Sequence, residues 1–417
     1  MIHQWKADLH IHTHHSDGQD TPGEVVLQAK ARQVKAIAIT DHDNITGLQE
    51  GIALGLREGI EVIPGVELST CYEDMDDIHL LGYYFDWMNA ELRERLQEFQ
   101  FHRVQRGKAI LEKVNTRLKA EGREVIPYEE LSARITGSLG RPHIAEQLRA
   151  RGYVRNNEEA FQQYLIPCNV QKPSLPLPEA MRLLQHARGI PVLAHPTYVT
   201  QDRPKLRQLL QEWSREGLLG LEAYHNGAEA IDITYFQKLA RAHGLTYTGG
   251  SDYHSEQYGS QIGSSRGQTL IPYVVALNLK RCYLHTYPFV LILESLAPAR
   301  QKRLVQVLAQ DYGISRASKA DLEVSLSLPL SSPLLFDTTL LSLSERETWY
   351  RTLSSGQIPY VILTEEEAWS SAGFPTVLWP ADRSLDPLHA PHFVVHQAIL
   401  TRLRASSPSA LRPGEAR

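Results

Sequence analysis

Residues Ala7–Gly18 read Ala-Asp-Leu-His-Ile-His-Thr-His-His-Ser-Asp-Gly, and the rest of the chain is organised around this stretch. Asp8, His10 and His12 alternate with apolar residues. Because alternate side chains of a β-strand point to the same face, the pattern predicts a strand that presents three polar groups on one side. Histidine is the commonest metal ligand among side chains, which favours a metal site. A single His-x-His is also compatible with a surface strand, so other motifs must decide between the two.

The composition indicates a soluble globular protein of more than one domain. The chain has 417 residues, of which 42% are hydrophobic and 22% charged, and its formal net charge is -5. A mildly acidic chain is not drawn to nucleic acid by its bulk charge, although a local basic patch is not excluded. The cysteines at 71, 168 and 282 form neither a CxxC pair nor a disulfide framework, which predicts a reducing, cytoplasmic compartment. We also expect no signal peptide and no membrane-spanning segment.

Strands and helices alternate after the first stretch. A short apolar strand at 36–40 is followed by His42, and another at 60–63 leads to Glu67. Strand-helix-strand repetition predicts an α/β fold with a parallel sheet or barrel. In such folds functional residues gather at the carboxyl ends of the strands, which is where these two residues lie.

Changes in this pattern divide the chain. Residues 1–88 and 179–272 carry the alternation and predict one catalytic unit built on that sheet or barrel, while residues 89–178 predict a helical insertion. Residues 273–404 predict a small C-terminal α/β domain without any cluster of His, Asp or Glu that suggests a chemistry, so its role stays open. Residues 405–417, rich in Ser, Pro and Arg, predict a disordered tail.

Nine possible ligands fall at the predicted strand ends. They are His10, His12, Asp17, His42, Glu67, His79, His195, Asp252 and His254. Each alone has an ordinary explanation, such as a core histidine, a turn residue or a helix cap. Together they are too many for one ion with four to six ligands, and they suit two or three ions with bridging carboxylates.

The motifs that carry these residues resemble the PHP (polymerase and histidinol phosphatase) family, in the family's order over about residues 6–272. They are Asp-x-His-x-His at 8–12, Ser-Asp-Gly at 16–18, Thr-Asp-His-Asp at 40–43, Pro-Gly-Val-Glu at 64–67, Ala-His-Pro at 194–196 and Gly-Ser-Asp-Tyr-His at 250–254. The resemblance implies a distorted (β/α)7 TIM-like barrel and a trinuclear site of divalent Mn, Zn or Fe.

Carried over by position, the resemblance implies three ligand sets. One ion would be held by His10, His12, Glu67 and Asp252, a second by Glu67, His79 and His195, and a third by Asp17, His42 and His254. Asp8 would support these ligands from behind.

The insertion resembles the branch of the family that acts on nucleoside phosphates, including 3′,5′-bisphosphates and short RNA 5′-ends. We therefore expect a metal-bridged hydroxide to hydrolyse a phosphate monoester of a small substrate, such as AMP or a 3′,5′-bisphosphate. Arg141 offers a bidentate fork for phosphate, and His143 is a candidate to protonate the leaving oxygen. Tyr224 and His225 are candidates for the substrate pocket. A solvated loop charge, a helix-start residue and simple packing are the respective alternatives.

Other functions stay open. A phosphodiesterase or 5′-3′ exonuclease would use the same ions on a short nucleic-acid end, and a histidinol-phosphate-type phosphatase would differ only in substrate. A metal-binding module without catalysis is opposed by the complete set of nine ligands. The sequence leaves the oligomeric state undecided.

Overall fold

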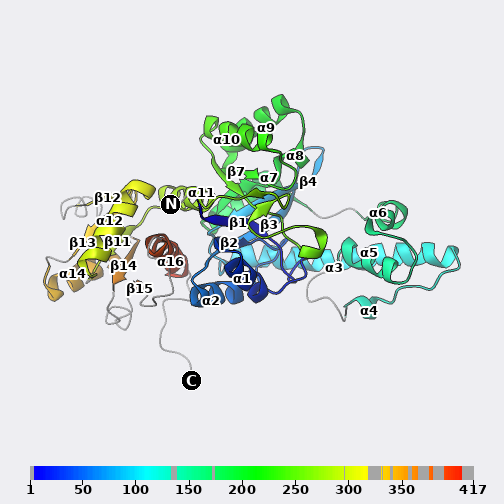
Figure 1. Ribbon diagram of the computed structural model, residues 1–417, viewed down its shortest axis with the longest axis horizontal. Coiled ribbons are helices and arrows are strands. Elements are labelled where there is room, and N and C mark those ends of the chain that lie inside the picture. The colour runs from blue at the N-terminus through cyan, green and yellow to red at the C-terminus, as the bar shows by residue number, and fades with distance from the viewer. Residues whose placement is uncertain are drawn as a thin grey trace, which may run out of the picture.

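The structure is a computed structural model that describes residues 4–132, 139–170, 174–294, 296–317, 330, 332–338, 341–355, 359–364, 375–378 and 389–405. Figure 1 shows three regions along the longest axis. A central sheet is covered by α9 (Arg203–Glu216) and α10 (Ala230–Ala242) on one side and by α1 (Pro22–Ala31) and α2 (Leu48–Glu58) on the other. Helices α3 to α6 project at one end, and a second sheet lies at the opposite end.

The central sheet has eight strands, and seven of them follow each other in the order β1-β2-β3-β4-β6-β7-β8. Their bounds are β1 Lys6–Ile11, β2 Val34–Ile39, β3 Glu61–Tyr72, β4 Met75–Tyr83, β6 Ile190–Leu193, β7 Gly220–Tyr224 and β8 Thr246–Gly249, and the eighth strand, β5 (Leu175–Pro176), pairs with β3. Strands β1, β2 and β3 are parallel to one another, and so are β6, β7 and β8. The predicted α/β class with a largely parallel central sheet is confirmed.

Strand β4 runs antiparallel to both of its neighbours, β3 and β6. Only Glu73 and Asp74 separate β3 from β4, and Glu73 adopts a left-handed φ of 52°. A parallel crossover needs a dozen or more residues, so this connection can only form a hairpin. The hairpin places His79 of β4 beside Glu67 of β3, with its Nδ1 atom 2.9 Å from the Glu67 carboxylate.

The end of β1 meets the segment that follows β8. Ile11 forms a parallel bridge with Tyr253, and the His12 amide donates to the Tyr253 carbonyl at 2.8 Å. The Ala7 amide donates to the Ile271 carbonyl at 3.0 Å. These bonds bring the first and last motifs of the sequence side by side. Helix α11 (Val274–Thr286) then packs on β8 and β1, just beyond the predicted end of the barrel.

The region between β4 and β6 is helical, with its own hydrophobic cluster. It contains α3 (Ala90–Ala120), α4 (Tyr128–Ser132), α5 (Arg141–Ala150), α6 (Asn157–Ala160) and a π-helical turn (Phe161–Leu165), and α7 (Leu177–His186) and α8 (Pro196–Val199) flank β6. Residues 133–138, which include part of the predicted turn before α5, lie outside the described residues.

The second sheet has five parallel strands in the order β12-β13-β11-β14-β15. Their bounds are β11 Val290–Leu293, β12 Ser315–Arg316, β13 Leu334–Asp337, β14 Tyr360–Thr364 and β15 Thr376–Leu378, with helices α12 Pro298–Tyr312, α14 Leu343–Ser355 and α16 Ala390–Ala405. The main hydrophobic cluster runs from the central sheet into this region without a break. The predicted domain boundaries stay predictions, and the tail from 406 onward lies outside the described residues.

Among the described residues, every helix is too short or too polar to cross a membrane.

Candidate metal centre

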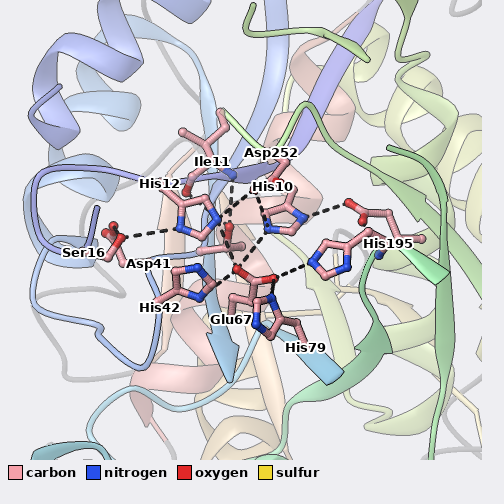
Figure 2. A network of polar contacts seen from close by, with 12 residues as sticks. His10, Ile11, His12, Ser16, Asp41, His42, Glu67, His79, His195 and Asp252 are labelled. Carbon is pink, nitrogen blue, oxygen red and sulfur yellow. Dashed lines mark hydrogen bonds and ion pairs between the residues drawn. The ribbon is translucent and has the colours of Figure 1, made fainter. Parts of the chain in front are cut away.

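Glu67 on β3 is the centre of the site and is 1% exposed. Figure 2 shows imidazoles arranged around its carboxylate. Five of them have ring nitrogens 2.9 to 3.3 Å from its oxygens, and these belong to His10, His12, His42, His79 and His195. The five histidines come from β1, β4 and the ends of β2 and β6, so the sheet brings together residues that are far apart in the sequence.

The remaining predicted ligands border the same cluster. The Oδ1 atom of Asp252 lies 3.2 Å from His12 Nε2 and 3.5 Å from His10 Nε2. Asp17, in the loop after β1, places its Oδ1 atom 3.3 Å from His254 Nε2. The structure therefore brings all nine predicted ligand residues into one cluster.

Several buried polar atoms of this cluster form no hydrogen bond within the described part of the chain. They are His10 Nε2, His12 Nε2, His42 Nδ1, His195 Nδ1, Asp17 Oδ1 and Glu67 Oε2. Buried polar atoms are costly without partners, and a mixed set of imidazole and carboxylate donors suits divalent transition metals. The residues thus fit metal ions on their own chemistry.

Three groups of ligand atoms are close enough to surround an ion, with all atoms of a group within 4.8 Å of one another. The groups are His12, Asp17, His42 and His254; His10, His12 and Glu67; and His42, Glu67 and His79. They overlap the ligand sets that the family resemblance implies, but His12 and His42 each belong to two groups.

Burial and charge adjust the protonation of these ligands. Burial alone would raise the pKa of Glu67, but the imidazoles of His42 and His79 outweigh it and hold this pKa well below its usual value. Burial lowers the pKa of His42 to about 4, against the opposing effect of Glu67 and Asp17. At pH 7 Glu67 is therefore ionised and His42 neutral, which are the forms in which these two residues bind metals. Against the effect of burial, the nearby carboxylates instead raise the pKa of His10, His12 and His195, so these imidazoles lose a proton when a metal binds.

Glu222 on β7 is a site residue that the sequence analysis missed. Its Oε1 atom lies 3.0 Å from His10 Nδ1, and its Oε2 atom accepts from the His195 amide at 2.8 Å. When His10 donates its Nδ1 proton in a hydrogen bond to Glu222, the lone pair on its Nε2 atom faces the ligand cluster. An acidic residue within the otherwise apolar strand Gly220–Tyr224 was the signal that could have revealed it.

Asp8 lies behind the ligands rather than among them. Its carboxylate accepts from the Ser251 amide at 2.9 Å and from the Gly263 amide at 2.7 Å, and burial raises its pKa to about 6. It therefore ties β1 to the segment that carries Asp252, a supporting position like the one the resemblance implies.

Asp41 fixes the loop that carries Asp17. It accepts from the Thr13 amide and hydroxyl, both at 2.7 Å, and from the Ser16 hydroxyl at 2.6 Å. Figure 2 includes this anchor beside the histidines.

The backbone is strained around the site. Asp43, His195 and Asp252 have φ angles of 48°, 24° and 50°, which non-glycine residues rarely adopt. Strain of this kind persists where the surrounding structure overdetermines the conformation, commonly at functional sites.

A pocket of about 200 Å³ opens next to His42 and His79. Three arginines line it: Arg103 and Arg106 from α3, and Arg141 from α5. The two on α3 were not predicted, because that helix is rich in charged residues and no spacing distinguishes them. A larger groove of about 340 Å³ between α3 and α7 contains none of the nine ligands in its lining.

The predicted phosphate residues occupy the start of α5. The guanidinium of Arg141 lies 5.6 Å from the ring centroid of Phe161. The Gly140 amide donates to His143 Nδ1 at 3.1 Å, and burial lowers the pKa of His143. His143 is therefore neutral at pH 7 with its proton on Nε2, so it both caps the helix and keeps a donor.

Tyr224 and His225 differ in their surroundings. The Tyr224 hydroxyl accepts from Gln237 at 3.0 Å, so this residue packs against α10. His225 is buried, accepts from the Gly227 amide at 3.1 Å through Nδ1, and has its pKa lowered to about 4 by burial. Its ring lies 5.9 Å from that of Tyr198, which in turn lies 5.2 Å from the ring of His195.

The model of the PHP domain matches residues 8–172. A 5′-3′ exoribonuclease of Haemophilus influenzae is 32% identical over 254 residues, which are 60% of this chain and 90% of that protein. This chain belongs to the PHP family. A 3′,5′-nucleoside bisphosphate phosphatase of Chromobacterium violaceum is 29% identical over 61% of this chain and 89% of its own length. A solved structure of a provisionally assigned metal-dependent phosphoesterase of Bifidobacterium adolescentis superposes with a TM-score of 0.58 and 25% identity, over 67% of this chain and 96% of that one.

The family membership predicted from the motifs is thus confirmed. This PHP protein is a metal-dependent phosphoesterase, a hydrolase that acts on phosphoric ester bonds. The relatives leave about two fifths of its length unmatched.

Proposed function

We propose that this PHP protein hydrolyses the phosphate monoester of a nucleotide, such as AMP or a 3′,5′-bisphosphate, at a site of three divalent metal ions. The observation that carries the proposal is the position of the arginine-lined pocket directly beside the ligand cluster. Cations and arginines on adjoining surfaces suit an anionic group that must be both bound and cleaved.

The ions are assigned to the ligand sets that the resemblance implies. The described contacts support sharing of Glu67, since its two oxygens face different histidines. Bound divalent cations would lower the pKa of a coordinated water and neutralise the phosphoryl oxygens. Glu222 and Asp8 hold the surrounding groups in place for this chemistry.

The arginines recognise the phosphate. Burial lowers the pKa of Arg106, and the neighbouring Arg141 and Arg103 lower it further, so three positive charges lie close together. Arg103 is paired with Asp43 at 2.9 Å, which holds it in place. Arg106 and Arg141 outnumber the carboxylate of Asp77 in the same lining, which favours a bound anion. His143 supplies a donor for the leaving oxygen from the same helix start.

A second candidate is a 5′-3′ exonuclease that acts on short RNA or DNA ends. One observation favours it: a further pocket of about 110 Å³ shares Asp77, Arg106 and Arg141 with the first and continues to Asn169 and Ser174. A cleft that extends past the arginines has room for more than one phosphate.

A phosphate-release screen tests the proposal. The purified protein would be loaded with Mn, Zn or Fe and offered nucleoside monophosphates, 3′,5′-bisphosphates, histidinol phosphate and short 5′-phosphorylated RNA. We expect the highest kcat/KM with a nucleotide. Release of mononucleotides from RNA with little free phosphate would establish the exonuclease instead, and preference for histidinol phosphate would contradict both.

Elemental analysis tests the ion count. We expect about three ions per chain after reloading, because nine ligands exceed the needs of one ion. A stoichiometry of one or below would contradict the trinuclear site while leaving the pocket as described.

A further inference from the structure

Tyr198 presents an exposed aromatic ring beside the metal centre. It belongs to the short helix α8, which follows the ligand His195 directly, and 63% of it is exposed. The ring centroids of Tyr198 and His195 are 5.2 Å apart. Large apolar side chains as exposed as this are few among the described residues, and a solvent-facing ring at the edge of a ligand cluster calls for a reason.

Neighbouring residues pack against the Tyr198 ring on one side and hold it in position. The imidazole of His225 lies 5.9 Å from Tyr198, and its Nε2 atom lies 3.5 Å from the Thr197 hydroxyl. Gly227 packs closely here, since a Cβ atom on it would come within 3.0 Å of the Tyr198 ring and 2.4 Å of the Thr197 hydroxyl oxygen. One side of the ring is therefore supported while much of it stays open to solvent.

The turn that carries the ring is equally constrained. His195 has a φ of 24°, and its amide donates to Glu222 at 2.8 Å. Glu222 also contacts the ligand His10, so the same side chain anchors both the metal centre and the turn that carries Tyr198. A prepositioned ring binds a planar partner with little loss of side-chain entropy.

Tyr198 and the arginines lie on different sides of the centre. In Figure 2, His42 and His195 flank Glu67 on opposite sides. The arginine-lined pocket adjoins His42 and His79, whereas Tyr198 adjoins His195 and is not part of that pocket's lining. A substrate with its scissile phosphate over Glu67 therefore has a cationic surface on one side and an aromatic one on the other.

We propose that Tyr198 stacks against the base of the substrate nucleotide and so selects nucleotides over phosphate esters that lack an aromatic ring. Every nucleobase offers a π-face, and stacking on an aromatic side chain tolerates different bases. Tyr198 is thus a specificity-determining residue. This inference rests on the proposed phosphatase function.

The experiment compares AMP with ribose 5-phosphate, which has the same sugar and phosphate but no base. For the wild type we expect a higher kcat/KM with AMP. Tyr198→Ala should lower kcat/KM for AMP about tenfold or more, mainly through KM, and change that for ribose 5-phosphate less than twofold. Tyr198→Phe and Tyr198→Trp should retain the preference for AMP. Leu56→Ala, at an exposed leucine on α2, is the matched control and should change neither substrate.

Each other outcome overturns the inference in a distinguishable way. Equal losses with both substrates in Tyr198→Ala would mean that the residue only supports His195. A wild type that cleaves both substrates equally well would remain a phosphatase but would not use stacking. A wild type that cleaves neither would contradict the proposed function itself, together with the role of Tyr198.

Discussion

At the scale of single residues, one carboxylate organises the site. Glu67 contacts five imidazoles, and several of these buried ring nitrogens make no hydrogen bond with any described residue. Buried polar atoms that make no hydrogen bond are costly, and bound metal cations would satisfy them. The removal of one ligand therefore affects more than one ion position.

We predict that Asp252→Asn and His42→Ala each abolish turnover with little change in the fold. Each substitution removes a ligand from a different part of the cluster, while the hydrophobic packing of the sheet is untouched. Thermal melting and steady-state kinetics would be measured on the same preparations. A kcat close to that of the wild type in either variant would show that the ions have a structural role only.

A second prediction concerns Glu222. In Glu222→Gln the amide cannot replace both carboxylate contacts, so the His10 tautomer is no longer fixed. We expect metal affinity or kcat to fall about 10- to 100-fold, as is typical for the partners of metal-binding histidines. Metal titration and kinetics provide the measurement. Glu216→Gln, at an exposed position on α9, is the control and should behave as the wild type.

The predictable part of the site follows from local patterns. The alternation of His10 and His12 and the carboxyl-end positions of His42 and Glu67 can be read from strand periodicity. The arginines on α3 could not be predicted in this way, because only the packing of the insertion beside the ligand cluster places two of its many charged residues in a pocket. Tyr224 was a candidate for the substrate pocket because of its position in the sequence, but its contact with Gln237 directs its side chain toward α10.

At the scale of elements, the length of the connection between β3 and β4 determines the direction of β4, which the periodicity of the sequence does not reveal. The alternation of strands and helices predicted the parallel pairs, yet β4 is antiparallel because two residues cannot span a crossover. The predicted boundary at 272 rests on a change in the character of the chain after the last motif at 250–254, and α11 beyond it packs on β8 and β1. The motifs identify the residues of the site, and the packing of the central sheet extends beyond them in the sequence.

The insertion helices supply the phosphate contacts, which leads to a third prediction. Arg106→Ala and Arg141→Ala should each raise KM for a nucleotide about 10-fold or more, since a charge-assisted hydrogen bond contributes about 1.5–3 kcal/mol. We expect a smaller effect on kcat, because neither residue belongs to the ligand cluster. Arg117→Ala, on the same helix but paired with Glu121, is the control. Unchanged KM in both variants would remove the arginines from the binding site.

At the scale of the whole molecule, a buried polar cluster joins the two sheets far from the metal centre. Glu61 at the start of β3 contacts Lys280 of α11 at 2.7 Å and His389, just before α16, at 2.9 Å. On α16, the Nδ1 atoms of His392 and His396 lie 3.0 Å from the hydroxyl oxygens of Tyr312 and Tyr84, respectively. The C-terminal region is therefore attached to the region of the central sheet through buried side chains, which explains why no linker marks its boundary.

This cluster makes the attachment sensitive to pH. Burial lowers the pKa of His392 and of His396 to about 3, with Lys280 adding to the effect and Glu61 opposing it, against an ordinary value of 6.5. Between about pH 6.5 and pH 3 the unfolded chain binds protons at these residues and the folded chain does not. The contribution of these two neutral histidines to the free energy of unfolding is therefore fully present above about pH 6.5. It is lost as the pH falls toward 3, by about 1.4 kcal/mol per pH unit for each histidine.

The last prediction follows from this linkage. His396→Asn keeps an acceptor for Tyr84 but cannot titrate, so its free energy of unfolding should fall less between pH 7.5 and pH 5 than that of the wild type. His186→Asn replaces a histidine that is 61% exposed and should follow the wild-type curve. Because acid also protonates metal ligands, all three proteins must be denatured with urea in metal-free form. Parallel curves for the wild type and His396→Asn would mean that His396 is charged in the folded protein, with Glu61 as the only nearby carboxylate described to balance it.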